Sequence, residues 1–238
     1  MKKTLAYMAA LAVVAVSAQA ATITWATATD MVGADGVADV LNEGTLFDTV
    51  NVNGSGAVTI DGVTFKTEAN SGISVNGNAH ADFVFDPNDP ALTSTDYLNG
   101  LDEGRYSVNT IQITGLTSGQ EYKVQVWAND ARGSQNVALG RSLYLNYGDG
   151  TAASNGVQVL DNQNVANTST LGQWIVGTFT ADAATETILA TGYDGSQFGD
   201  EYGVVPLVQV REVPEPATLG MIGALGGLML FIRRRFMI

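Results

Sequence analysis

The sequence predicts an all-β sandwich or barrel for residues 21–212, between a signal peptide over 1–20 and a C-terminal segment, 213–238, that contains one transmembrane helix. Short runs of alternating apolar and polar residues, separated by turn formers, run through the central region. That region is also rich in Gly, Asn, Thr and Asp. No amphipathic helical stretch of four turns occurs in it, which argues against a mixed or helical fold.

The N-terminus has the pattern of a secretory signal peptide. Lys2 and Lys3 form a positive region, residues 5–16 are apolar, and Ala18-Gln19-Ala20 is the small-x-small triplet behind which signal peptidase cuts. The apolar run is too short for a comfortable membrane span. We therefore expect export and cleavage after Ala20.

The first strands of the domain are expected around tight turns. Val58-Thr59-Ile60 and Val63-Thr64-Phe65 flank Asp61-Gly62, which is a hairpin signal. A strand over 73–75 is expected to end at Asn76-Gly77, and another short strand is expected over 81–85. Residues 86–104 are rich in Pro, Asp, Asn and Thr, which predicts a long surface loop with one helical turn near 94–98.

The clearest strand pair is 107–114 with 121–128, because both alternate with a period of two. The segment between them, Leu116 to Tyr122, resembles a tyrosine corner, in which a tyrosine near a strand start bonds back to the upstream backbone of a Greek-key sandwich. Five later strands bring the total to about ten: 142–147, 157–160, 173–180, 187–191 and 204–210.

The C-terminal segment combines a proline motif, an apolar stretch and a basic end. Pro214-Glu215-Pro216 precedes residues 217–232, and Arg233, Arg234 and Arg235 follow. Sixteen helical residues span about 24 Å, close enough to a ~30 Å hydrocarbon core when arginines snorkel. Arginines beyond a span stay cytoplasmic, so the domain is expected to face outward.

This tail resembles the PEP-CTERM sorting signal of Gram-negative bacteria in its Pro-Glu-Pro motif, glycine-rich apolar helix and arginine cluster. The resemblance implies recognition by an exosortase, a membrane-embedded cysteine protease or transpeptidase. That enzyme would remove the tail near Pro216 and pass the protein to the cell surface or its polysaccharide matrix. A plain C-terminal membrane anchor is the alternative, and the two differ in whether the anchor survives.

The stretch from Gly115 to Arg211 is also similar to a recurrent ectodomain of PEP-CTERM proteins. The similarity lies in the runs 125–132, 172–182 and 208–211, together with Arg141. This similarity implies a galactose-binding-like jelly roll. It supports the architecture only and does not indicate a function.

Composition excludes several classes of function. Residues 21–216 carry 24 acidic and six basic side chains, a net charge of about −18, so we expect no binding to nucleic acid. The sequence has no cysteine, which excludes disulfides, thiol catalysis and cysteine metal sites.

No catalytic motif is recognisable, so no enzymatic activity is expected. The one histidine, His80, lacks a marked nucleophile or acid and is interpreted as a solvated or hydrogen-bonded bystander. Paired carboxylates could serve a secreted glycoside hydrolase, but none stands in a distinctive context among the candidates Glu43, Glu68, Glu103, Glu121, Glu186 and Glu201.

Two ligand sites remain as hypotheses. Asp194, Asp200 and Glu201 lie on a glycine-bearing turn and could hold a structural calcium ion, or could simply form turns. Trp127, Asp130 and Arg132 could bind carbohydrate if the tryptophan ring is exposed. Packing of Trp127 against another layer, and an ion pair of Asp130 or Arg132 with Arg141 or a neighbouring acid, explain the same pattern.

The sequence therefore predicts a non-enzymatic protein of the cell surface or extracellular matrix of a biofilm, made as an inner-membrane-anchored precursor. Its expected partners are signal peptidase, an exosortase and an exopolysaccharide. A carbohydrate-binding adhesion module is the main alternative, and a secreted glycoside hydrolase is a further one.

Overall fold

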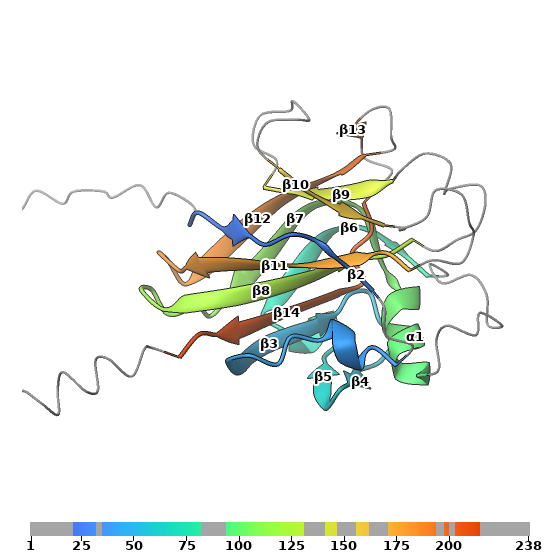
Figure 1. Cartoon of the computed structure of the whole chain (residues 1–238), viewed down its shortest axis with the longest axis horizontal. Helices are drawn as coiled ribbons and strands as arrows, with labels where there is room; N and C mark the ends of the chain where they lie inside the picture. The colour runs from blue at the N-terminus through green and yellow to red at the C-terminus, as the bar shows by residue number, and fades with distance from the viewer. Residues whose placement is uncertain are drawn as a thin grey trace, which may run out of the picture.

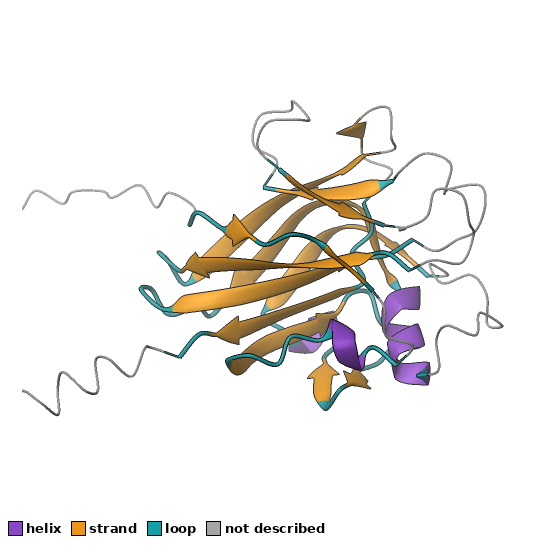
Figure 2. Ribbon diagram, viewed as in Figure 1, coloured by secondary structure: helices purple, strands orange, loops and turns teal. Residues whose placement is uncertain are grey.

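The computed structural model describes residues 21–31, 35–81, 94–130, 141–146, 156–161, 171–193, 198–199 and 203–214. Two antiparallel β-sheets lie face to face, with a small hairpin and a short helix beside them (Figure 1). Among the described residues, helix is confined to short segments (Figure 2). The predicted all-β sandwich is confirmed.

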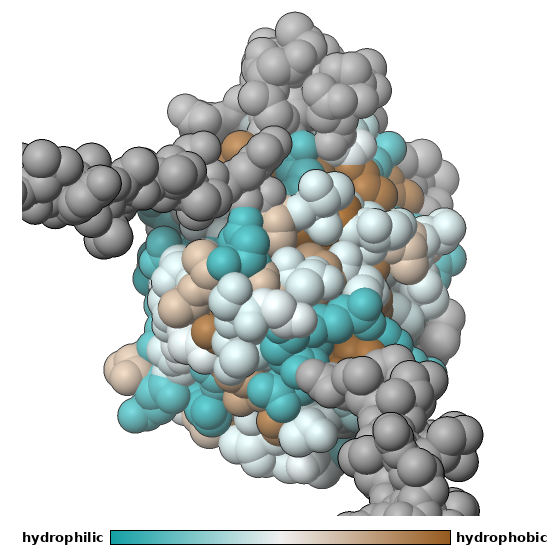
Figure 3. All heavy atoms as spheres, turned by 90° about the vertical axis from the view of Figure 1, so that its left-hand side faces the viewer, coloured by the Kyte–Doolittle hydropathy of each residue, from teal (hydrophilic) through white to brown (hydrophobic). Residues whose placement is uncertain are grey.

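The first sheet has the strand order β1-β11-β8-β14-β3, and β2 also pairs with β11. Its strands are β1 (Thr24–Trp25), β2 (Thr29–Asp30), β3 (Thr45–Asn51), β8 (Glu121–Ala128), β11 (Gln173–Thr180) and β14 (Leu207–Glu212). The chain enters this sheet at β1 and leaves it after β14 at the same end of the sandwich (Figure 1). That end is covered mainly by hydrophilic and intermediate residues (Figure 3).

The second sheet has the order β10-β9-β12-β7-β6, with β13 paired to β12. Its strands are β6 (Ile73–His80), β7 (Gly104–Thr114), β9 (Ser142–Leu145), β10 (Val157–Leu160), β12 (Thr185–Tyr193) and β13 (Phe198–Gly199). The first half of β12 pairs with β7 and its second half with β9, so this strand joins the two parts of the sheet.

The main core lies between the two sheets and follows from period-two alternation. Val124 and Val126 of β8 are fully buried against Ile111 and Ile113 of β7 and the other inward-facing residues. Tyr122 is fully buried too, and its hydroxyl accepts a hydrogen bond from the N–H of Thr117 at 3.0 Å. This bond confirms the predicted tyrosine corner.

A second hydrophobic cluster covers the outer face of the first sheet. The hairpin β4 (Val58–Ile60) and β5 (Val63–Phe65) packs there with α1 (Thr95–Asp102). The cluster also includes Trp127 of β8 and Leu207 of β14, both fully buried. The first sheet is therefore buried on both faces over part of its length.

Polar contacts fix α1 and the 3₁₀ turn η1 (Val37–Asp39) to this cluster. Ser94 caps α1 by accepting a hydrogen bond from the N–H of Tyr97 at 3.2 Å. The buried Tyr97 hydroxyl donates to Asp39 at 2.8 Å, and Trp174 Nε1 donates to the other oxygen of that carboxylate at 3.2 Å. Burial and the Asp39 charge raise the pKa of Tyr97 well above its usual value.

Several predicted elements have the predicted bounds. Strands β4, β5, β8, β10 and β11 coincide with the predicted ranges, and Asp61 and Gly62 form the hairpin turn with φ values of 48° and 73°. The predicted helical turn is the longer helix α1. The remaining predicted strands that the structure describes differ at their ends by a few residues.

Other expectations were wrong or incomplete. Asn76-Gly77 is not a turn: β6 continues through it with a register shift against β7. Strand β3 was not predicted, and of the predicted strand 81–85 only Ala81 is described, outside any strand. No helix in the described part of the chain is long and apolar enough to cross a membrane. The expected signal peptide, 1–20, and transmembrane helix, 217–232, lie outside that part.

Candidate functional sites

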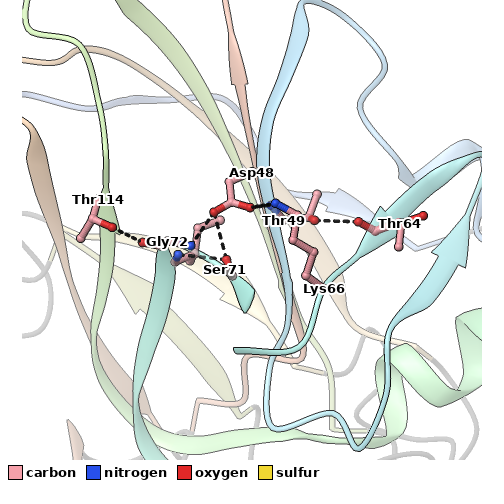
Figure 4. Close-up of polar contacts among 8 residues, drawn as sticks. Asp48, Thr49, Thr64, Lys66, Ser71, Gly72 and Thr114 are labelled. Atoms are coloured by element: carbon pink, nitrogen blue, oxygen red, sulfur yellow. Dashed lines mark hydrogen bonds and ion pairs between the residues drawn. The ribbon is translucent and has the colours of Figure 1, made fainter. Parts of the chain in front are cut away.

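A cluster of polar contacts surrounds Asp48 of β3 (Figure 4). Its carboxylate accepts hydrogen bonds from Lys66 Nζ at 2.7 Å, the Gly72 N–H at 2.6 Å, the Thr49 N–H at 2.9 Å and Ser71 Oγ at 3.2 Å. The Asp48 side chain is about 10% exposed, whereas that of Lys66 is 46% exposed. A carboxylate from the first sheet thus binds the segment that leads into β6 of the second.

The electrostatics of this cluster favour a structural role over a catalytic pair of base and nucleophile. We call the hydrogen bonds around this carboxylate the Asp48 clamp. Burial alone would raise the pKa of Asp48, but the donors Lys66, Gly72 and Thr49 outweigh it and hold that pKa below its usual value. A carboxylate with a lowered pKa is a weak proton acceptor. Ser71 Oγ already donates to Asp48 and accepts from the Ile73 N–H at 2.9 Å, so its proton and one of its two lone pairs are engaged. We interpret the cluster as structural.

The carbohydrate hypothesis for Trp127 is corrected by its burial. The side chain is fully buried, and its ring meets that of Phe65 edge to face, with centroids 5.5 Å apart. A sugar needs an open ring face, and this ring has none because the β4–β5 hairpin covers it. Of the two interpretations, packing against another layer is the right one.

Asp130, the second residue of that hypothesis, forms the ion pair that was its alternative interpretation. It is 2% exposed, and Arg141 Nη1 lies 3.2 Å from its Oδ2. Its N–H donates to the carbonyl oxygen of Asp161 at 2.7 Å. Arg132, the third residue, lies outside the described residues.

Asp161 is a buried acid that sequence reasoning missed. Burial, and next the Asp130 charge, raise the pKa of its carboxyl well above the usual value. The backbone N–H groups of Val204 and Gly203 and the charge of Arg141 oppose this rise without cancelling it. The predicted strand Val157-Gln158-Val159-Leu160 ends just before Asp161. An aspartate directly after a strand is typical of a turn, so the sequence did not single this residue out.

The remaining predicted sites fall mostly outside the described residues. These comprise the calcium residues Asp194, Asp200 and Glu201, the processing residues Ala18 and Ala20, and the sorting residues Glu215, Pro216, Arg233, Arg234 and Arg235. In the described part of the chain, no group of three or more His, Cys, Asp or Glu side chains could hold a metal ion.

Pro214 is described, and it stands where the folded domain ends. The Val213 N–H donates to the Glu121 carbonyl oxygen at 2.9 Å, and Gln120 Nε2 donates to the Val213 carbonyl oxygen at 2.7 Å. Pro214 itself is exposed. The backbone is therefore anchored up to the residue that precedes the proline motif.

His80 ends β6 and has contacts of its own. Its Nδ1 is hydrogen-bonded to the Ala81 carbonyl oxygen, and its ring meets Tyr106 edge to face at 5.8 Å. His80 is therefore hydrogen-bonded, which is one of the two environments that the sequence interpretation allowed.

A polar pocket of about 190 Å³ lies between α1 and the loop before β4. Its lining includes Asp96, Asp102 and Glu103. Two of these acids hold backbone of that loop and of β4, because Glu103 accepts from the Ser55 N–H at 2.5 Å and Asp96 from the Thr59 N–H at 3.2 Å. These bonds indicate that the acids fasten α1 to the hairpin.

The strands of the second sheet carry few charged side chains, which is unusual in so acidic a chain. Strands β6, β7, β9, β10 and β12 carry only two charged side chains, Arg105 and Glu186. Arg105 is paired with Glu68 through two hydrogen bonds of 3.0 and 2.8 Å, and Glu186 is 2% exposed. We call the outer face of this sheet the neutral face.

Hydroxyl and amide groups stand in cross-strand rows on the neutral face. Two rows of paired residues run across β6, β7 and β12, Ser74–Gln112–Thr187 and Asn76–Thr110–Leu189. Further along the sheet, the half-buried Tyr144 of β9 meets Tyr193 of β12 edge to face, with ring centroids 5.9 Å apart. Leu189 is 45% exposed. The face thus offers hydrogen-bonding groups beside one exposed leucine and a pair of tyrosine rings.

Comparison with the models of known protein families, with curated proteins and with solved structures finds no match to this chain.

Proposed function

We propose that this protein is an exported, non-enzymatic component of the cell surface or extracellular matrix, sorted by an exosortase through a PEP-CTERM-type tail. The observation that carries the proposal is the position of the proline motif. Backbone bonds from Val213 hold the chain up to the exposed Pro214, so Pro214-Glu215-Pro216 begins directly after the folded domain. A protease that cuts near such a motif needs accessible chain there.

The architecture and charge fit this role. We assign the sandwich to the galactose-binding-like jelly-roll type, supported by its two antiparallel sheets and its tyrosine corner. A domain with a net charge of about −18 stays soluble and repels anionic lipid and nucleic acid. Both ends of the described chain leave the sandwich at one end, so one end faces the membrane in the precursor (Figure 1).

Mass spectrometry of the protein from its native host tests this proposal. We expect an N-terminus at Ala21 and a C-terminus near Pro216, with the arginine tail absent. A chain that is intact through Ile238 in the membrane fraction would instead indicate a plain membrane anchor and would overturn the sorting step.

A second candidate function, binding of a neutral polysaccharide, is favoured by the neutral face. Rows of amide and hydroxyl groups such as Gln112, Thr110 and Asn76 can bond to sugar hydroxyls without the cost of burying a charge. The Tyr144 ring adds an aromatic surface. Among the described residues of this face, Leu189 is the one large hydrophobic side chain that is exposed, whereas a protein–protein interface core is usually apolar.

Affinity electrophoresis of the full chain in a polyoxyethylene detergent, which has no sugar headgroup, tests this second candidate. We expect dextran or galactomannan to retard the protein and anionic alginate not to. Gln112→Glu should weaken retardation about tenfold by placing an unpaired charge on the face. Thr117→Glu, at an exposed loop position, is the matched control and should change nothing. Equal retardation of both variants would refute the site.

A further inference from the structure

The first residue after the predicted signal-peptide cleavage site contacts a buried carboxylate. The backbone nitrogen of Ala21 lies 3.3 Å from Oε2 of Glu186, which is 165 residues away in sequence. Glu186 is 2% exposed, and its Oε1 has no hydrogen-bond partner in the described structure. A single amide N–H is thus a small part of what this carboxylate can accept.

Glu186 occupies a position where the fold calls for an apolar residue. On β12 it alternates in phase with Ile188 and Ala190, which point into the core between the sheets. None of the ion pairs among described residues includes Glu186. Burial raises the pKa of this carboxyl, and the nearby charge of Asp182 raises it further. The N–H groups of Ala21 and Thr187 lower the pKa without cancelling that rise.

The segment that carries Ala21 is held in place by the domain. Ala21 packs against the main core, Ile23 is 8% exposed within it, and β1 pairs with β11 through Thr24 and Trp25. The nitrogen of Ala21 is therefore positioned by its own neighbours and does not depend on Glu186 for its location.

We infer that signal-peptide removal completes the fold by creating an ion pair between the new α-ammonium of Ala21 and Glu186. This inference rests on the export step of the proposed function. Hydrolysis of the Ala20–Ala21 bond adds the hydroxyl of water to the Ala20 carbonyl carbon and leaves the Ala21 nitrogen as an amine. That amine takes up a proton at neutral pH, because α-amino groups have pKa values of about 7.7–8.0.

The product suits the site better than the precursor does. An ammonium offers three donors where the amide offers one, so Oε1 as well as Oε2 can be satisfied. A buried carboxylate without a cation is costly, and a paired one is much less so. Processing therefore changes the domain itself, and the mature protein is more stable than its precursor.

A two-by-two comparison of variants tests the inference. Chains over 21–238 are produced from a cleavable fusion. Cleavage leaves either Ala21 at the N-terminus or two added residues, Gly-Ser, in front of Ala21, and each form is made with Glu186 or with Glu186→Gln. Thermal unfolding is followed at pH 6.5 in detergent. With Ala21 first, Glu186→Gln should lower Tm by about 5 °C. With Gly-Ser first, the same substitution should leave Tm unchanged or raise it.

Equal effects of Glu186→Gln in the two backgrounds would overturn the ion pair. A pH series supplies an independent readout. The pair raises the pKa of the amine in the folded state, so at pH values where Glu186 is ionised its stabilisation is present up to about pH 8 and is lost as pH rises through that raised pKa. Mass spectrometry of the native N-terminus tests the export step separately. A negative result for the ion pair is therefore distinguishable from a negative result for export.

Discussion

Asp48 and Asp161 are both buried, and their surroundings shift the pKa values of their carboxyl groups in opposite directions. Asp48 is surrounded by donors, and its pKa is lowered. Asp161 is fully buried near another acid, and its pKa is raised. The sign of each shift decides how the free energy of unfolding changes with pH.

The Asp48 clamp should stabilise the fold at neutral pH and weaken in acid. Since its folded-state pKa lies below the unfolded value of about 3.9, its contribution is present above that value and lost as pH falls through the folded pKa. We expect Asp48→Asn to lower the free energy of unfolding by about 2 kcal/mol at pH 7, with a smaller difference at pH 2.5. Urea titrations at the two pH values measure this.

Asp61→Asn is the matched control for this substitution. Asp61 is exposed at the hairpin turn, and asparagine tolerates its φ of 48°. We expect a change within 0.5 kcal/mol at both pH values, as is usual for surface positions. If both variants lost the same free energy of unfolding, the effect of Asp48→Asn would be explained by removal of a negative charge, and the hydrogen bonds of the clamp would contribute nothing.

Asp161→Asn should have the opposite sign. A raised folded-state pKa means that the native state binds the proton more tightly, so stability falls as pH rises from the unfolded pKa through the folded pKa. Asparagine is neutral throughout, and we expect it to raise Tm by about 3 °C at pH 7, with no gain at pH 3. A lower Tm at pH 7 would show that the ionised carboxylate is needed there, as it would be for a bound cation.

At the scale of elements, the β4–β5 hairpin depends on the backbone of its turn. Gly62 has φ of 73°, where a Cβ is strained although no atom lies within 4 Å of it. Gly62→Ala should cost about 1 kcal/mol in the free energy of unfolding. Gly56→Ala is the control, because Gly56 also faces open space but has no positive φ, and it should be neutral or slightly stabilising. Similar costs at both sites would contradict the strain argument.

Local pattern predicted those strands whose two faces differ. Strand β11 alternates between the core and a more exposed face, and its bounds were predicted. Strand β3 has buried Asp48, Thr49 and Asn51 in succession with Val50, because it is covered on both faces, and no alternation marks it. Gly77 was taken as a turn residue, but a Cβ there would lie 2.7 Å from the Tyr106 carbonyl oxygen. Close backbone approach, which a sequence does not display, explains this glycine.

At the scale of the whole molecule, the carbohydrate hypothesis for Trp127 was wrong because it depended on a layer that local pattern does not reveal. Period two placed Trp127 off the main core, as observed, but the hairpin and α1 cover that face. Conversely, the apolar phase of β12 marks Glu186 as an inward acid, and only the three-dimensional arrangement brings Ala21 to it. The neutral face was readable from sequence once the second sheet's strands were grouped.

The basic end of the chain should orient the precursor through its charge. Arg233, Arg234 and Arg235 follow a stretch that we expect to span the membrane, and Lys and Arg count equally in retaining a flank in the cytoplasm. We expect replacement of all three by serine to prevent tail removal, whereas replacement by lysine preserves it. Mass spectrometry of the membrane fraction distinguishes the two, since the serine variant should remain intact through Ile238. If the lysine variant also stayed intact, the guanidinium groups themselves would be recognised, and charge alone would not explain the sorting step.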